Sequence, residues 1–325
     1  MRLLNQWFLR HQRTLPWRQN PTPYAVWVSE IMLQQTQVSV VLPYFQRWMH
    51  LFPTIESLAN ASRERVIKAW EGLGYYSRAR NLHEGAKYVM QMHRGVLPRD
   101  REALAKVKGI GPYTVGAILS FAFKEAAAAI DGNVMRVMTR FFRIETEIER
   151  IETKREVEKK VLSLLGPEPW ITMEGLIELG ALICKKKPLC EECPLSQQCL
   201  GKGLDLPRRK KRVEVTLIAK NIAVIESEGA VLLRKRKEGL MADLFEFPEL
   251  REVDHLSLVL KGELPPVAHS YTRYRATLTP TRFTLEKQPF VEDLEWVSLS
   301  LLHLFPFSSG HRRIVDILYN KSTNE

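Results

Sequence analysis

Two carboxylates in the sequence have the types and surroundings for acid–base chemistry. Glu30 is the only charged residue in the apolar stretch 24–33. An apolar setting favours the protonated carboxyl, so we expect Glu30 to act as a general acid near neutral pH. Asp131 opens the segment 131–142, whose pattern is a helix cap followed by a helix. Backbone donors and the helix dipole favour an ionised cap aspartate.

Carboxylates held in opposite protonation states can divide the work of cleaving a glycosidic bond. One protonates the leaving group and the other stabilises the positive charge that develops on the sugar. The alternatives are structural: Glu30 as a half-exposed residue at a helix margin, and Asp131 as a cap alone.

The elements between these two residues favour a nucleic-acid partner. Residues 104–119 join two helical patterns through Gly109-Ile110-Gly111, with Pro112 at the start of the second helix. Such a turn lets the backbone approach a phosphate, and Lys108 lies beside it. The sequence carries 48 Lys and Arg against 37 Asp and Glu, a formal net charge of +11. This excess suits a polyanion, although a simply basic protein and an isolated helix turn remain alternatives.

The cysteines form one cluster. All four lie in the loop 184–199, as Cys184, Cys190, Cys193 and Cys199. Such clustering indicates a metal or iron–sulfur site in a reducing compartment rather than a disulfide scaffold. Four cysteines can hold zinc or a four-iron cluster, and the spacing, which is not that of a paired zinc ribbon, favours iron–sulfur.

Organisation along the chain predicts two parts. Residues 1–206, which include the cysteine loop, show apolar residues at helical spacing. The basic run 207–213 reads as a linker, and residues 214–325 mix strand patterns with one helix. No stretch is long and apolar enough for a membrane span, and the start lacks a signal-peptide pattern. We therefore expect a cytoplasmic, nucleoid-associated monomer.

Several motifs together resemble those of the MutY family of adenine DNA glycosylases. They are the stretch 15–18 (Leu-Pro-Trp-Arg), the stretches 30–38 and 72–82, the hairpin 109–114, the triplet 131–133 and the cysteine loop. The resemblance implies an all-α helix-hairpin-helix glycosylase domain with a [4Fe–4S] module, followed by an α+β, Nudix-like domain at 214–325. It implies a base-excision repair hydrolase that removes adenine mispaired with 8-oxoguanine or guanine in double-stranded DNA.

The resemblance also implies roles for individual residues. In the reaction, Glu30 would protonate adenine at N7, Asp131 would stabilise the sugar cation, Tyr113 would lie beside Asp131, and Asn133 would position water. The adenine pocket would comprise Leu15, Trp17, Arg18 and Glu178. The duplex would be probed and held by Gln35, Leu73, Tyr75, Lys108, Gly109 and Gly111. The opposite base would be read by Tyr271, Thr272 and Arg273, and the cluster held by the four cysteines.

Tyr113 and two departures from the family pattern refine the expected activity. Related bifunctional enzymes carry at the position of Tyr113 a lysine that forms a Schiff base, which a phenol cannot do, so we expect base removal without efficient strand cleavage. The first cysteine gap is one residue shorter than is usual in the family, and Arg273 stands where the family has a histidine. The alternatives are a glycosylase for T or A opposite G, and a DNA-binding protein with a degenerate site. No acidic metal-binding Nudix box is present, which speaks against nucleotide hydrolysis.

Overall fold

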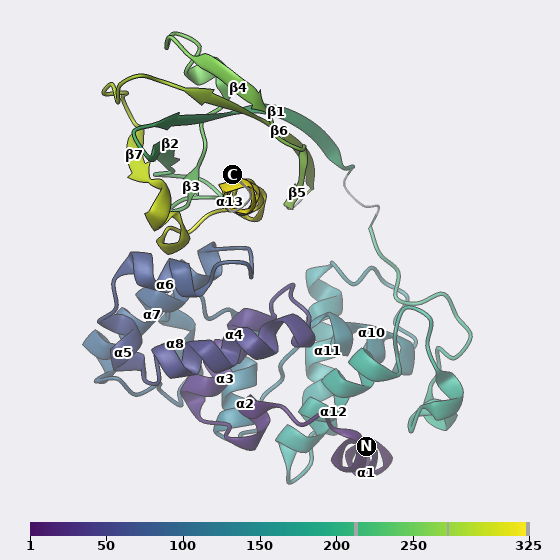
Figure 1. Ribbon diagram of the computed structural model, residues 1–325. Helices are drawn as coiled ribbons and strands as arrows, with labels where there is room; N and C mark the ends of the chain where they lie inside the picture. Colours follow the sequence, from purple (N-terminus) through teal and green to yellow (C-terminus); the bar gives the residue numbers. More distant parts are fainter. Residues whose placement is uncertain (211–213, 272, 323–325) are drawn as a thin grey trace. The chain divides into compact units, whose positions relative to one another are not determined.

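The computed structural model of the chain describes residues 1–210, 214–271 and 273–322 (Figure 1). The chain divides into two compact units. The first unit contains Met1–Asn60 and Asn81–Lys211, and the second contains Ala61–Arg80 and Arg212–Glu325. The predicted linker 207–213 falls at this division, but its residues 211–213 lie outside the described part of the chain. The predicted domain boundaries therefore stay a prediction.

The first unit is helical. Its elements are α1 (Arg2–His11), α2 (Pro16–Gln19), α3 (Pro23–Leu33), α4 (Val38–Leu51), α5 (Ile55–Ala59), α7 (Ser77–His93, whose first residues belong to the second unit), α8 (Arg101–Lys106), α9 (Pro112–Ala117), the π-helical turn η1 (Ile118–Ala122), α10 (Gly132–Phe141), α11 (Ile151–Leu164), α12 (Pro169–Leu182), and the short turns η2 (Cys190–Glu192) and η3 (Ser196–Gln198).

Two of these helices form the core of the first unit. Every residue of α3 from Tyr24 to Met32 is buried, and α12 is buried along most of its length. A helix that is apolar on all sides belongs in an interior. The start of α3 is fixed locally, because the Thr22 hydroxyl accepts a hydrogen bond from the Ala25 amide at 3.2 Å and Pro23 follows the cap. A rigid, buried helix therefore carries Glu30.

The second unit combines a sheet with helices. Its elements are α6 (Arg63–Ala69), β1 (Thr216–Ser227), β2 (Ala230–Lys235), β3 (Phe245–Glu246), η4 (Leu250–Glu252), β4 (Val259–Glu263), β5 (Val267–Tyr271), β6 (Tyr274–Thr284), β7 (Glu295–Ser298), η5 (Leu299–Leu304) and α13 (Ser309–Ser322). The described strands form one mixed sheet in the order β3-β2-β1-β6-β4, in which β5 also pairs with β6 and β7 with β2. Only the β1–β6 pair is parallel among the pairings of these strands.

The core of the second unit lies between the sheet and α13. Ile314 and Val315 of α13 are fully buried and belong to one apolar cluster with Val224 of β1 and Leu278 of β6. Gly310 lies so near the sheet that a Cβ there would come within 2.9 Å of the His269 side chain. Helix and sheet therefore approach closely at the start of α13.

The segment 61–80 is held to the rest of the second unit by charge-assisted hydrogen bonds. Glu71 Oε1 accepts from the Arg312 Nε at 2.8 Å and from the Phe307 amide at 3.0 Å. The Tyr76 hydroxyl donates to the Phe307 carbonyl at 3.1 Å. The prediction of an all-helical part followed by an α+β part is confirmed. Within the described ranges, no helix is both long enough and apolar enough to cross a membrane.

Candidate active site

A cavity of about 660 Å³ in the first unit brings together residues from distant parts of the sequence. Its volume lies within the range of small-ligand sites. Eight residues for which the sequence predicted a role line it: Leu15, Trp17, Arg18, Glu30, Gln35, Tyr113, Asp131 and Asn133.

Glu30 lies on α3 at the wall of this cavity and is 6% exposed. The Tyr113 hydroxyl, from α9, donates a hydrogen bond to Glu30 Oε2 at 2.7 Å. Burial raises the pKa of Glu30 to about 7, while the Tyr113 hydrogen bond opposes this rise. Burial and the negative charges of Glu30 and Asp131 raise the pKa of Tyr113 well above its usual range, so the phenol remains a donor. The direction of this shift is the one that the sequence predicted from the apolar surroundings of Glu30.

Asp131 caps α10 and also lines the cavity. Its Oδ1 accepts from the Val134 amide at 2.7 Å, and its Oδ2 accepts from Asn133 Nδ2 at 2.7 Å. These donors stabilise the carboxylate, but burial outweighs them and raises the pKa of Asp131. The expectation that the cap would depress this pKa is therefore wrong. The local donors do lower the pKa, but desolvation of the buried carboxylate raises it by more.

Close helix packing fixes the Asp131 cap. A Cβ at Gly180 of α12 would lie 2.6 Å from the Asn133 Cβ, so the start of α10 rests directly on α12. Arg136 adds a second restraint: its Nη2 donates to Asn133 Oδ1 at 2.8 Å and to the Gly180 carbonyl at 2.7 Å. Asn133 is thereby oriented with its amide nitrogen toward Asp131. Arg136 also lines the cavity and was missed by sequence reasoning.

Arg18 lines the cavity together with Arg13 and Arg136, and two carboxylates of α12 hold it. Arg18 Nε lies 2.7 Å from Glu174 Oε2, and Arg18 Nη2 lies 2.9 Å from Glu178 Oε2. Glu178 is fully buried and also binds Arg13 at 2.7 Å. Its pKa falls to about 2, because hydrogen bonds from Arg13 and Arg18 more than offset the effect of burial.

Glu174, and not the predicted Glu178, is the α12 carboxylate that lines the cavity. Burial raises the pKa of Glu174, and the Arg18 charge opposes the rise. Sequence reasoning missed Glu174. The sequence feature that could have identified Glu174 is its position four residues before Glu178, because residues at i and i+4 share one helix face.

The hairpin has the backbone character that the sequence predicted, and Gln35 has an unusual backbone conformation of its own. Gly109 has φ +87°, and a Cβ there would lie 2.9 Å from the Asn81 Cβ, so this position requires glycine. Gly111 caps α9 in an extended conformation, and Lys108 is exposed beside the turn. Gln35 has φ +58°, which is uncommon for a residue other than glycine and holds the end of α3 in a sharp turn.

The remaining DNA-directed predictions fall in the second unit. Leu73 is buried, whereas Tyr75 is 42% exposed and has φ +49°. Tyr271 ends β5, and its ring lies 5.4 Å from that of Tyr274. Arg273 donates to the Tyr274 hydroxyl at 3.3 Å. Thr272 lies outside the described residues.

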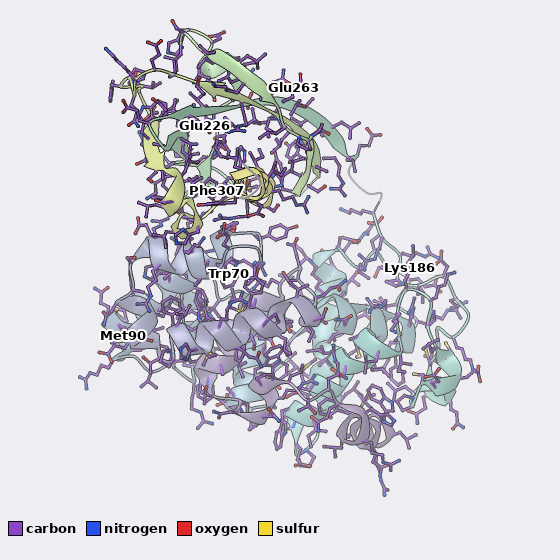
Figure 2. All side chains as sticks on the ribbon, viewed as in Figure 1. Trp70, Met90, Lys186, Glu226, Glu263 and Phe307 are labelled. Atoms are coloured by element: carbon purple, nitrogen blue, oxygen red, sulfur yellow. The ribbon has the colours of Figure 1, made fainter. Side chains whose placement is uncertain are left out.

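The four cysteines line one cavity of about 230 Å³ and form no disulfide. Arg140 of α10 anchors the loop, since its Nη1 lies 3.3 Å from Cys184 Sγ and donates to the Lys185 carbonyl at 2.6 Å. Lys186 projects from the same loop (Figure 2). In the part of the chain that the structure describes, no three His, Cys, Asp or Glu side chains are grouped to hold a metal ion.

Comparisons with known proteins agree with this architecture. Residues 28–166 match the HhH-GPD superfamily of base excision DNA repair proteins, and residues 221–316 match the NUDIX domain family. A solved thermostable thymine-DNA glycosylase superposes with a TM-score of 0.57 at 27% identity, covering 62% of this chain and 93% of that one. The first unit therefore has the helix-hairpin-helix glycosylase fold, and the second is Nudix-like.

Sequence relatives narrow the class. The adenine DNA glycosylase of Buchnera aphidicola (strain Bp) is 35% identical over 80% of this chain and 76% of its own length. That of Arabidopsis thaliana is 38% identical over 76% of this chain, and the match spans 46% of the plant protein. The chain belongs to the adenine DNA glycosylase family. The predicted family, fold class and enzyme class are thereby confirmed.

Proposed function

We propose that the protein hydrolyses the N-glycosidic bond of adenine mispaired with 8-oxoguanine or guanine in double-stranded DNA. The observation that carries the proposal is one cavity lined both by Glu30, a buried carboxyl with a pKa of about 7, and by the capping carboxylate Asp131. The excess of basic residues suits the DNA partner, and the nucleoid is the proposed place of action.

In the proposed reaction, Glu30 donates its proton to N7 of the leaving adenine. The Tyr113 hydroxyl holds one carboxyl oxygen of Glu30, which leaves the other oxygen for the proton transfer. Asp131 stabilises the positive charge that develops on the sugar as the bond to adenine breaks. Asn133, held by Arg136, donates to Asp131 and positions the attacking water.

Base recognition in the proposal relies on α2 and on the residue before it. Leu15 and Trp17 supply apolar surface, and Arg18 supplies donors. We assign to Glu174 the place that the sequence gave to Glu178, because Glu174 faces the cavity and Glu178 is occupied by Arg13 and Arg18. Glu178 then holds Arg18 in position through their ion pair.

The DNA contacts follow from the family resemblance. Extruding a nucleotide costs a few kcal/mol, less at a mismatch, and inserted side chains and phosphate contacts must offset it. Gln35, Leu73 and Tyr75 are proposed to probe the duplex, and Lys108 with the glycines of the 109–111 turn to hold its backbone. Tyr271, Thr272 and Arg273 are proposed to read the opposite base.

The cysteine loop is proposed to hold a [4Fe–4S] cluster. The cavity of about 230 Å³ is lined by four thiols, the number of ligands that such a cluster needs, and Arg140 donates toward the Cys184 sulfur. The cluster would position the loop, whose lysines 185–187 are exposed and are proposed to contact DNA phosphates. Iron analysis and visible absorption of the purified protein test this assignment, and stoichiometric zinc without iron would refute it.

A cleavage panel tests the function. Duplexes carry A or T opposite 8-oxoguanine, G or C, and products are resolved with and without alkali. We expect excision of A opposite 8-oxoguanine and G, and strand breaks only after alkali, because Tyr113 cannot form a Schiff base. Cleavage of T opposite G would favour the mismatch-glycosylase alternative, and efficient breaks without alkali would contradict base removal alone. Glu30→Gln should abolish excision and preserve duplex binding; binding without excision by the unaltered protein would indicate a degenerate site.

A further inference from the structure

Lys124 in the first unit has no part in the proposed excision reaction, and its backbone conformation is unusual. The Phe123 amide donates to the Ile118 carbonyl at 3.2 Å, which ends η1, and Lys124 follows with φ +61°. This left-handed conformation is costly for a residue that carries a side chain, and glycine adopts it most easily. Because such outliers are concentrated at functional sites, the side chain of Lys124 is a candidate for a role that glycine could not fill.

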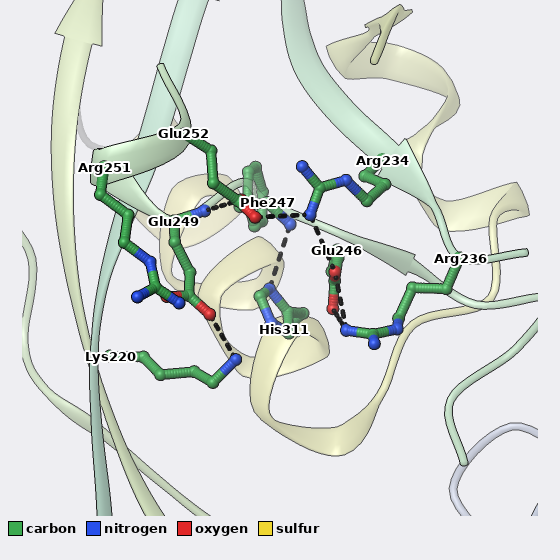
Figure 3. A network of polar contacts seen from close by, with 9 residues as sticks. All are labelled: Lys220, Arg234, Arg236, Glu246, Phe247, Glu249, Arg251, Glu252 and His311. Carbon is green, nitrogen blue, oxygen red and sulfur yellow. Dashed lines mark hydrogen bonds and ion pairs between the residues drawn. The ribbon is translucent and has the colours of Figure 1, made fainter. Parts of the chain in front are cut away.

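The ammonium group of Lys124 contacts an aromatic ring. Its Nζ lies 5.0 Å from the centroid of the Trp170 ring, within the distance at which a cation is attracted to an aromatic face. The basic side chains of the second unit in Figure 3 are instead paired with carboxylates: Arg234 with Glu252, Arg236 with Glu246, and Lys220 and Arg251 with Glu249. Lys124 is therefore held by a contact that does not neutralise its positive charge.

The Trp170 contact brings the ammonium group to the helix face that carries Glu174. Trp170 and Glu174 lie four residues apart on α12, so their side chains share one face of the helix. Glu174 lines the cavity and its side chain is 12% exposed. Lys124 is exposed and is not one of the described residues that line the cavity. Any effect of Lys124 on a bound base must therefore pass through a residue such as Glu174.

Electrostatic effects link Lys124 and Glu174 in both directions. Burial raises the pKa of Glu174, and the charges of Arg18 and Lys124 oppose this rise. The charge of Glu178 acts in the same direction as burial. Burial lowers the pKa of Lys124, and the charge of Glu174 opposes this fall. Lys124 therefore favours the ionised form of Glu174, and water and salt screen part of this effect because Lys124 is exposed.

Glu174 in turn acts on groups that the proposed reaction uses. Burial is the largest cause of the raised pKa of Glu30 and of Tyr113, and the charge of Glu174 adds to both. An ionised Glu174 therefore helps to keep Glu30 protonated.

The charge of Glu174 also decides which hydrogen bonds it can form with a base. An ionised carboxylate only accepts, whereas a protonated carboxyl also donates. Adenine carries an exocyclic amino group, which is a donor, beside the acceptor N7. An ionised Glu174 is therefore suited to the amino group, and a purine that lacks this group offers no donor there.

We propose that Lys124 is a positioning residue for adenine recognition: held by Trp170 on the face of α12, it keeps Glu174 ionised, so that Glu174 accepts a hydrogen bond from the exocyclic amino group of the base. This inference rests on the proposed excision of adenine and adds to it a residue that does not touch the base. Loss of Lys124 should weaken the distinction between adenine and a purine without the amino group. The effect should be largest at acidic pH, where Glu174 begins to protonate.

Titration of Glu174 tests the charge effect without DNA. Glutamate carboxyl groups of the full chain are isotope-labelled, and the Glu174 NMR signal is the one that Glu174→Gln removes. Lys124→Gln should raise the midpoint of the Glu174 titration by about half a pH unit, the size expected for one partly screened charge, and Lys124→Arg should restore it. Lys160→Gln is the matched control. Lys160 Nζ lies 4.3 Å from the Phe142 ring, so this variant removes an equal charge and the same kind of contact from α11.

Excision assays test the effect on recognition. Values of kcat/KM are measured from acidic to neutral pH on duplexes that carry adenine, or unsubstituted purine, opposite 8-oxoguanine. The preference for adenine should be lost at low pH. The pH at which it is lost should be about half a unit higher in Lys124→Gln than in the unaltered protein, and Lys160→Gln should leave it unchanged.

Lys124→Gly separates the charge from the fold. Glycine adopts φ +61° without strain, so this variant should melt about 2 °C higher than the unaltered protein. It should still shift the Glu174 titration as Lys124→Gln does. A residue with a purely structural role would give the change in stability and no shift.

Three results would overturn the proposal. These are a Glu174 titration that neither Lys124→Gln nor Lys124→Gly moves, an equal shift in Lys160→Gln, and a shift that leaves the pH dependence of the adenine preference unchanged. Excision of adenine by the unaltered protein is measured in the same assays, so failure of the role of Lys124 leaves the proposed function standing. A protein that excises no adenine would refute the proposed function, whatever the titration of Glu174 shows.

Discussion

The proposed acid should reduce the stability of the protein above neutral pH, and replacing Glu30 by glutamine should recover that loss. Glu30 has a pKa of about 7 in the folded chain against an ordinary value of 4.5. At a pH between these two values, Glu30 is deprotonated in the unfolded chain and still protonated in the folded chain. Stability therefore falls as the pH rises from about 4.5, and the full loss is present above pH 7.

The size of the effect follows from the shift. A difference of about 2.5 units corresponds to about 3 kcal/mol of unfolding free energy at pH 8, and to about 1 kcal/mol at pH 5. Glutamine matches the shape of the protonated carboxyl, and its amide oxygen can still accept from Tyr113. Glu30→Gln should therefore stabilise the chain by about 2 kcal/mol more at pH 8 than at pH 5.

Urea denaturation at the two pH values measures this difference. Glu156→Gln is the control: it removes a carboxylate from α11 whose side chain is 49% exposed, and it should change stability by less than about 0.5 kcal/mol at either pH. If Glu30→Gln gives the same change at both pH values, or destabilises the chain more at pH 8, then Glu30 is not a buried acid with a raised pKa.

Other predictions concern the neighbours of Glu30. Tyr113→Phe removes the hydrogen bond that lowers the pKa of Glu30, so the alkaline fall of the single-turnover excision rate should move upward by about one pH unit, whereas Tyr88→Phe leaves it in place. Asp131→Asn keeps the α10 cap but should slow excision by about 100-fold or more, with stability changed by under about 1 kcal/mol in a melting curve. Arg136→Met frees the Asn133 amide and should lower the excision rate more than the duplex affinity, as single-turnover and binding assays would show. A pH profile that does not move would contradict the first prediction, for Tyr113→Phe. An excision rate that is not reduced would contradict the second, for Asp131→Asn. A loss of duplex affinity without a loss of rate would contradict the third, for Arg136→Met.

Local chemistry explains which features the sequence revealed. The Asp131 cap, the Gly109 turn and the apolar surroundings of Glu30 each depend on residues close in the chain, and the structure has all three. The pKa of Asp131 was predicted in the wrong direction, because its local donors are visible in sequence and its burial is not. Burial depends on how α10 meets the rest of the unit.

The choice between Glu174 and Glu178 shows the same limit. Both lie on one face of α12, and either can reach a cation. What separates them is Arg13, which comes from the opposite end of the first unit's sequence and occupies Glu178 in a bidentate pair at 2.7 and 2.9 Å. Because Arg13 balances the charge of Glu178, Arg18 can also pair with Glu174 and remain at the cavity wall. The fold brings Arg13 and Arg18 to the two glutamates of α12, and this arrangement decides which glutamate lines the cavity.

Arg136 connects the cysteine loop to the reaction site. One guanidinium donates to the Cys184 carbonyl at 2.6 Å and to the Asn133 amide oxygen at 2.8 Å. The backbone of the first cysteine and the side chain that orients Asp131 therefore share a single rigid connector. Because the guanidinium fork is planar, a shift of the loop at Cys184 must either move Asn133 or break one of these bonds. The cysteine loop thus acts on the site through geometry, and a ligand that fixes the loop also fixes the donor to Asp131.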